Sequence, residues 1–542
     1  MSKVAAYLRG HLAGEVVTRQ DVRDAMSTDT GVLKIKPEMV IYPKNTNDIR
    51  KVARFSWQLA QKGHALPITV RGGGTDATGA AIGKGIALVT TAHMNKIFEY
   101  EQKQKLIRLQ PGVTIAAASQ SLSLAGAAIM SLHSSHAYGT VGGAIASAVT
   151  GPLAGKYGTI EKSIDQLEVV LANGDVLQTG RISKRELNRR KGLQGFEGDI
   201  YRGIDGIIEE YADVLDTLRA NDATGYNTIA DVKQKDGSFD LTPLFVGSQG
   251  TLGIVTEMIM RAEFRSLHVS AAALVFSNSN AARDALDELC KMAPALIDYV
   301  DAELFETAKK AGKVYQWYDD ATKDVPAAAV VVVGFDEFND RHRNKRLKRI
   351  IKMFGKSEEV VCITAHGDDA DLLLDALSVP HYTTTPDDIE QAAPGVLSGF
   401  HVPTERLEDF TIALEALAKK HHVSMPMTGH VFTNTYSVYP SFNLHKVGDK
   451  QKVLALLADL TKLVNAHGGT MIAEGGEGRL KAPFVYAELD EKVVKLYQEV
   501  RKVCDPFNTL NPGVKAVGEV KELVPMLRSS PDAGQLAHFG VA

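Results

Sequence analysis

A glycine-rich loop at residues 71–85 is the segment whose composition points most directly to a ligand. It begins RGGGTD, and further glycines stand at positions 79, 83 and 85. Successive backbone N–H groups in such a turn form a concavity that binds anions. Glycine also lets the backbone approach a pyrophosphate with no Cβ atom in between, and the hydroxyl of Thr75 can add a donor. We therefore interpret the loop as a phosphate-binding segment.

Two other interpretations of the loop are open. The spacing Gly72-x-Gly74-x-x-Ala77 matches a loose dinucleotide fingerprint, but that fingerprint requires a helix directly after the loop. Here three more glycines and a strand-like run follow, so a helix cannot readily start. The second alternative is a purely structural turn between strands, which needs fewer glycines than this loop contains.

The loop lies between two predicted strands, LPITV (66–70) and GIALVTT (85–91). Upstream, residues 37–63 predict a short strand and then a helix capped by Thr46 or Asn47. Downstream, residues 166–180 predict a hairpin that turns at Asn173-Gly174, and residues 243–262 form another strand-rich stretch. We expect residues 33–264 to form one α+β domain, preceded by a polar helical segment at 1–32.

The pattern changes after residue 265, where strands and helices alternate. Such alternation favours a second α+β domain built on one sheet, at residues 265–490. Residues 491–542 are expected to form a helix and a tail that return to the first domain. The predicted strands lie at 267–276, 327–335, 359–364, 426–432 and 435–442, and the predicted helices at 279–292, 340–354, 405–420 and 453–464.

Composition narrows the class of protein. The 542 residues are enough for two or three domains, and 61 basic against 65 acidic residues leave no basic footprint for nucleic acid. The sequence has no apolar run long enough for a transmembrane segment and no signal-peptide pattern at the N-terminus. The three cysteines lie far apart and match neither zinc spacing nor a disulfide framework. A cytoplasmic protein fits these observations best.

Three further motifs follow the loop in order: residues 134–180 with TVGGAIA, residues 247–257 (GSQGTLGIVTE) and residues 504–513 (CDPFNTLNPG). Together the four segments resemble the FAD-binding oxidoreductases of the vanillyl-alcohol oxidase / p-cresol methylhydroxylase superfamily. Within it, the chain is most similar to the D-lactate, glycolate and D-2-hydroxyglutarate dehydrogenase branch. The resemblance implies an α+β fold with a two-subdomain FAD-binding domain of p-cresol-methylhydroxylase type and an α+β, ferredoxin-like cap domain.

The resemblance also implies where FAD binds. The loop would wrap the pyrophosphate, a strand and turn at 135–146 would line the ribityl chain and the isoalloxazine, and two later segments would complete the site. Covalent relatives carry a histidine where Thr75 stands, so FAD is expected to bind non-covalently through this loop. The implied cofactor-binding residues are Arg71, Gly72, Gly73, Gly74, Thr75, Asp76 and Gly79, then Ser135, His136, Thr140, Gly142, Gly143 and Ala146, then Gly151, Gly158, Ile254 and Val255.

The residues expected to act on the substrate differ from those of the D-lactate, glycolate and D-2-hydroxyglutarate dehydrogenase branch. Its members bind a divalent metal through two histidines and a glutamate, and a further histidine is the general base. This chain keeps His430 and Glu474, but Gly475 replaces the base, and Tyr439 or Ser437 stands at the second histidine, depending on the alignment. No arginine for a substrate carboxylate lies between 349 and 406, and His445 fits poorly as a replacement ligand. We expect a metal-free catalytic site with these residues: His430, Tyr439, Glu474 and Arg479.

The sequence therefore predicts an FAD-dependent oxidoreductase that oxidises a hydroxyl-bearing small molecule by hydride transfer, a D-2-hydroxy acid by family. One alternative is a metal-independent enzyme for another alcohol, a sugar or an aromatic substrate, with tyrosine in acid–base work. A second is a flavin-binding protein that has lost catalysis. Oxygen, a quinone, a cytochrome or a partner flavoprotein remain open as the electron acceptor, and a homodimer is possible.

Overall fold

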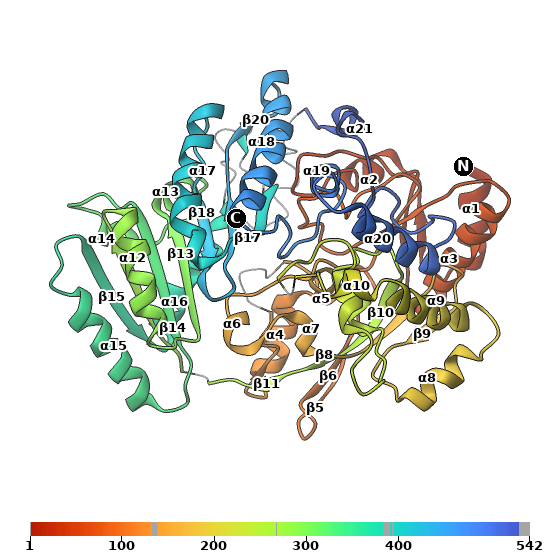
Figure 1. Ribbon diagram of the computed structural model, residues 1–542, viewed down its shortest axis with the longest axis horizontal. Helices are drawn as coiled ribbons and strands as arrows, with labels where there is room; N and C mark the ends of the chain where they lie inside the picture. Colours follow the sequence, from red (N-terminus) through yellow and green to blue (C-terminus); the bar gives the residue numbers. More distant parts are fainter. Residues whose placement is uncertain are drawn as a thin grey trace.

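The computed structural model describes residues 2–132, 138–219, 221–266, 268–382, 391–392 and 395–529. Figure 1 shows a glycine-loop part and a cap part built on one large sheet, with the C-terminal helices lying back over the first part. The α+β class predicted from the sequence is confirmed.

The first sheet carries the glycine loop. It has four strands in the order β1 (Glu15–Val17), β2 (Met39–Tyr42), β4 (Ile86–Val89) and β3 (Ile68–Arg71). β2, β4 and β3 are parallel, and the loop leaves the carboxyl end of β3 and returns without a helix to β4. The predicted absence of a helix after the loop is thus confirmed.

Two local predictions in this part were wrong. The cap of α3 (Thr46–Gln61) is Asn45, whose side chain accepts the N–H of Asp48 at 3.1 Å, one residue before the predicted positions. The N-terminal segment is not only helical: besides α1 (Ser2–His11) and α2 (Gln20–Ala25), it contributes β1, which pairs antiparallel with β2.

The second sheet is antiparallel and has five strands in the order β5 (Ile97–Glu101), β6 (Leu106–Leu109), β10 (Ile254–Arg261), β8 (Ile164–Val170) and β9 (Val176–Gln178). The predicted hairpin is present as β8 and β9, and Gly174 in its turn has φ +86°. Helices surround this sheet: α4 (Ile115–Ser123), α5 (Val141–Ala146), α8 (Lys184–Lys191), α9 (Phe196–Glu210) and α11 (Thr242–Phe245).

Two expectations fail next to this sheet. Residues 141–146 form the short helix α5 instead of a strand and turn, because Thr140 caps it by accepting the N–H of Gly143 at 3.1 Å. The stretch 243–262 is a strand only from residue 254 onward, since a helical turn, α11, precedes it.

The cap is a seven-stranded antiparallel sheet in the order β15 (Val360–His366), β12 (Ser270–Phe276), β14 (Ala329–Phe335), β13 (Leu296–Asp301), β18 (Met427–His430), β19 (Thr435–Val438) and β17 (Leu397–His401). β13 was not predicted. The helices covering it are α12 (Ser279–Cys290), α13 (Ala302–Lys310), α14 (Gln316–Ala321), α15 (Asp340–Phe354), α16 (Asp368–Leu374), α17 (Leu407–His421) and α18 (Val447–Ala466).

Alternation along β12 explains why helices cover both faces of this sheet. Ala272, Leu274 and Phe276 belong to the hydrophobic cluster that contains α12, α15, α17 and α18. Their neighbours Ala271, Ala273 and Val275 belong to a second cluster with α13, α14 and α16. Successive side chains of a strand point to opposite faces, so a fully apolar strand fits a sheet that is buried on both sides.

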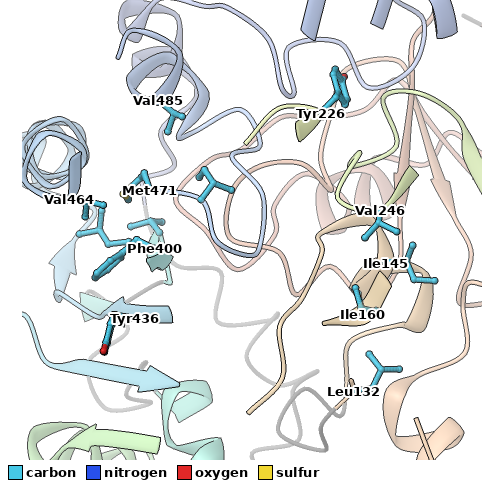
Figure 2. Close-up of a cluster of buried hydrophobic side chains, with 14 of the residues drawn as sticks. Leu132, Ile145, Ile160, Tyr226, Val246, Phe400, Tyr436, Val464, Met471 and Val485 are labelled. Atoms are coloured by element: carbon cyan, nitrogen blue, oxygen red, sulfur yellow. The ribbon is translucent and has the colours of Figure 1, made fainter. Parts of the chain in front are cut away.

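The larger cluster includes buried residues of both parts of the chain. Figure 2 shows Phe400, Tyr436 and Val464 from the cap, and Ile145 and Val246 from the glycine-loop part. The chain returns to that part through α19 (Ala482–Tyr486), α20 (Glu491–Cys504) and α21 (Val520–Leu523). Leu510 forms a parallel bridge with Ile68 of β3.

Candidate active site

A cavity of about 640 Å³ is bordered by the glycine loop and by strands of the cap. Cofactor and ligand sites typically enclose about 300–1,000 Å³. Eleven of the predicted cofactor-binding residues line it: Gly72, Gly73, Gly74, Thr75, Asp76, Thr140, Gly142, Gly143, Ala146, Ile254 and Val255. Arg71, Gly79, Gly151 and Gly158 do not, and Ser135 and His136 lie outside the described residues.

The glycines of the loop are required by close packing against residues 138–140. A Cβ atom on Gly73 would lie 2.6 Å from the carbonyl oxygen of Tyr138, and one on Gly72 would overlap Thr140. Gly74 has φ +75°, a conformation that glycine adopts at little cost. Gly72, Gly73 and Gly74 therefore fit here only because they carry no side chains, and their backbone borders the cavity.

Arg71 supports the loop from behind. Its guanidinium donates to the carbonyl of Thr28 at 2.8 Å, and it lies where a Cβ atom on Gly74 would be. Burial lowers the pKa of Arg71, whereas the charges of Asp29 and Asp76 raise it. Asp76 in turn accepts the N–H groups of Thr78 and Ala80 at 3.0 and 2.9 Å. Both side chains thus hold the shape of the loop, and the cavity-facing donors are its backbone and Thr75.

The residues present fit FAD on two structural grounds. The backbone from Gly72 to Thr75 borders the cavity with no Cβ on its glycines, as a pyrophosphate cradle requires. Across the cavity, an added Cβ on Gly475 would meet nothing within 4 Å, so the backbone there leaves open room for a flat ring.

The cap contributes the polar end of the cavity. On β18, Thr428 and His430 face it, and on β19 and just beyond, Thr435, Ser437 and Tyr439 do so. Alternate residues of a strand share a face, so Tyr436 points instead into the core, where it is 2% exposed. Ser437 and Tyr439, the two candidates for the position of the second histidine, therefore both line the cavity.

His430 forms an ion pair with Asp298, a residue that sequence reasoning missed. The two are directly opposite in the β13–β18 pair, and His430 Nδ1 lies 2.8 Å from Asp298 Oδ2. Burial lowers the pKa of His430, but the charge and the hydrogen bond of Asp298, with a smaller effect of Glu474, raise it to about 9 overall. His430 is therefore a cation near neutral pH.

Asp298 has a second, unused oxygen. Its side chain is 5% exposed, and Oδ1 has no hydrogen-bond partner among the described residues. An unpaired buried carboxylate oxygen is costly unless a ligand or water satisfies it. Asp298 itself is one of the residues that line the cavity.

Glu474 also lines the cavity and is close enough to His430 for the two charges to interact. Its Oε2 accepts the backbone N–H of Thr150 at 2.7 Å, which fixes the carboxylate. Burial raises the pKa of Glu474, and the charge of His430, the Thr150 hydrogen bond and Lys481 oppose that rise. A carboxyl group with a raised pKa is a better proton acceptor than an ordinary one, and so suits acid–base work.

Arg479 is not part of the cavity lining. It donates to the carbonyls of Ile82 and Pro512 and to the side chain of Asn511, and so ties the 474–479 turn to the C-terminal segment. The predicted catalytic role of Arg479 is therefore replaced by a structural one. Polar lining residues that sequence reasoning missed include Asp29, Asp298, His381 and Arg528.

Among the described residues, no three His, Cys, Asp or Glu side chains are grouped so that they could hold a metal ion. His445 does not line the cavity. A search of the same residues found no helix with the length and hydropathy of a membrane span.

Two domain families match the chain: the FAD binding domain at residues 37–180, and the C-terminal domain of FAD linked oxidases at residues 266–514. A D-2-hydroxyglutarate dehydrogenase of Pantoea ananatis is 24% identical over 92% of this chain and 50% of its own length. A glycolate oxidase subunit of Bacillus subtilis is 24% identical over 88% of each chain, and a D-lactate dehydrogenase of Anaerostipes hadrus 21% over 93% and 94%. The chain spans about half the length of the first of these relatives.

Solved structures share the fold. A 4-ethylphenol oxidase from Gulosibacter chungangensis superposes with a TM-score of 0.69 at 15% identity, covering 96% of this chain and 98% of the oxidase. An alkyldihydroxyacetonephosphate synthase gives 0.62 at 14% identity, covering 94% and 86%. The predicted p-cresol-methylhydroxylase-type fold is confirmed. The chain therefore contains the FAD binding domain followed by the C-terminal domain of FAD linked oxidases.

Proposed function

We propose that this enzyme oxidises the carbinol carbon of an uncharged, hydroxyl-bearing small molecule, with Glu474 as proton acceptor and protonated His430 as the group that holds the substrate oxygen. The observation that carries the proposal is the His430–Asp298 pair beside Glu474 in one cavity. The residues that would hold FAD are the cavity-lining ones of the glycine loop, with Thr140, Gly143, Ile254 and Val255. Bound FAD supplies the hydride acceptor.

Residues of the chain accept the substrate proton and bind the substrate oxygen. Glu474 takes the hydroxyl proton as the C–H hydride leaves, so that a carbonyl product forms and the charges balance. His430, kept protonated by Asp298, donates to the substrate oxygen and stabilises negative charge that develops there. Burial raises the pKa of Tyr439, which therefore stays protonated and can donate a second hydrogen bond.

The charges around these groups favour an uncharged substrate. Asp298 and Glu474 contribute two carboxyl groups, and His430 contributes one positive charge. Among the described residues that line the cavity, the single arginine or lysine is Arg528, which is fixed to the N-terminal segment near the glycine loop and not to the cap. A substrate carboxylate would therefore meet no arginine at the cap end, which makes an alcohol, a sugar or an aromatic alcohol the preferred class.

A D-2-hydroxy acid is the second candidate. The names of three similar proteins, and the positive charge of His430, favour it. Anaerobic bleaching of the flavin absorbance separates the candidates when glycolate, D-lactate and D-2-hydroxyglutarate are compared with uncharged alcohols, sugars and benzylic alcohols. Fast bleaching only by the acids would replace the proposal with the second candidate. No bleaching by any member of the panel would favour a flavin-binding protein without this catalysis.

A further inference from the structure

The chain continues past the matched oxidase domain, which ends at residue 514, and then packs against its own N-terminal part. We call residues 520–529 the C-terminal strap. Lys34 N donates to Met526 O at 2.7 Å, and Arg528 N donates to Val32 O at 3.0 Å. Leu33 and Leu527 face each other in an antiparallel bridge. The strap is thus held by backbone hydrogen bonds to residues 32–34, directly after Asp29 and Thr30 of the cavity lining.

This docking brings Arg528 into the cofactor cavity. The residue is 7% exposed and lines the cavity together with Asp29 and the glycine loop. Asp29 ties its own segment to the glycine loop, because one of its oxygens accepts the N–H of Gly31 and the other accepts the N–H of Gly79, each at 2.9 Å. Arg528 is close enough to Asp29 for its charge to affect that carboxyl group.

Negative charge accumulates at the glycine-loop end of the cavity when FAD is bound, and the positive charge of Arg528 can offset it. The pyrophosphate of FAD is doubly negative, yet Asp29 and Asp76 lie at this end. Burial and the charge of Asp76 raise the pKa of Asp29 to about 8, against the Gly31 hydrogen bond and the charges of Arg71 and Arg528. Since Arg71 is turned toward Thr28 behind the loop, Arg528 is the one arginine or lysine among the described residues that lines the cavity.

We propose that Arg528 binds the pyrophosphate of FAD and makes the C-terminal strap a latch that retains the cofactor. A guanidinium presents paired N–H donors that match phosphate oxygens, and such charge-assisted hydrogen bonds are about twice as strong as neutral ones. The inference rests on the FAD assignment and on none of the substrate chemistry proposed above.

The test measures FAD release from the holoenzyme, followed as the flavin fluorescence that recovers on dissociation. The series Arg528→Lys, Arg528→Gln and Arg528→Glu should release FAD progressively faster. The glutamine variant should be on the order of 10- to 100-fold faster than the parent, the usual effect of losing a charged hydrogen bond. Lysine should restore most of the retention, because it keeps the charge.

A matched control lies on the same strap. Lys521 has a side chain that is 78% exposed and pairs only at the surface with Glu519, so Lys521→Gln should leave FAD release unchanged. Equal release rates across the Arg528 series would overturn the proposal. So would rates that follow the thermal stability of the flavin-free variants instead of the charge at position 528, since that pattern indicates a structural role alone.

Discussion

The imidazole of His430 and the carboxylate of Asp298 form a 2.8 Å ion pair across β18 and β13, although 132 residues separate them in sequence. The pair fixes the ring through Nδ1 and leaves Nε2 for the cavity, where a quarter of the side chain is accessible. Four predictions about this site and its cofactor follow from the geometry, and a fifth concerns metal.

Asp298→Asn should shift the pH dependence of flavin reduction. Asp298 raises the pKa of His430 to about 9, against burial, which lowers it. Activity that needs protonated His430 is therefore present below pH 9 in the parent and is lost as pH rises through that value. Without the carboxylate, the pKa should fall to about the ordinary 6.5 or below, and the rate at pH 8 should fall on the order of ten-fold or more. A variant that is slower with an unchanged pH profile would contradict this role.

Glu474→Gln should slow flavin reduction by about 10²–10⁴-fold, the typical contribution of a general base. Glutamine keeps the size of the side chain and an oxygen for the Thr150 N–H, so the fold and the FAD content should remain. The exposed Glu488→Gln is the control and should behave like the parent. A near-normal rate constant in single-turnover reduction of Glu474→Gln would exclude this residue as the proton acceptor.

Gly73→Ala should sharply reduce the FAD content of the purified protein. The new methyl carbon would lie 2.6 Å from the Tyr138 carbonyl, so the loop would have to move away from residues 138–140. Gly10→Ala, in α1, meets nothing within 4 Å and should retain full flavin content. Equal flavin-to-protein absorbance ratios in the two variants would show that the loop does not shape the cofactor site.

FAD should leave the protein intact on acid precipitation. Thr75 lines the cavity where covalent relatives carry the attaching histidine, and a threonine hydroxyl cannot form that bond. The supernatant should contain all of the yellow colour and give the mass of free FAD. Flavin that stays with the precipitated polypeptide would point to another attachment site on the chain.

The parts of the fold that local patterns encode were predicted well. The glycine loop without a following helix, the Asn173-Gly174 hairpin and the amphipathic helices α15 and α17 all depend on neighbours within a few residues. The cap of α3 differed by one residue, because Asn45, Thr46 and Asn47 can all cap and sequence does not select among them. Helix α5 was missed since its two glycines argue against a helix, while the Thr140 cap and its packing favour one.

The arrangement of the site could not be predicted in the same way, because it depends on pairing between strands that are distant in sequence. β13 reads LIDYVD between two buried faces, so it lacks the apolar–polar alternation that marks a half-buried strand. An Asp in the interior of that apolar run was the available signal for Asp298, whereas Asp301 ends the strand. The partner of Asp298 could not be predicted, because strand pairing selects it. The family motif led us to expect Arg479 in the site, but its guanidinium donates to carbonyls from segments distant in sequence and does not line the cavity.

The most direct test of a metal-free active site measures bound metal and anaerobic flavin reduction on the same preparation, before and after treatment with EDTA. We expect well under one zinc or manganese per chain, because His430 and Glu474 alone provide too few protein ligands for a stable site. An uncharged hydroxyl substrate should then bleach the flavin at the same rate before and after chelation, and D-lactate should do so slowly. A stoichiometric metal that EDTA removes, together with fast reduction by D-lactate that returns only when the metal is restored, would contradict the account.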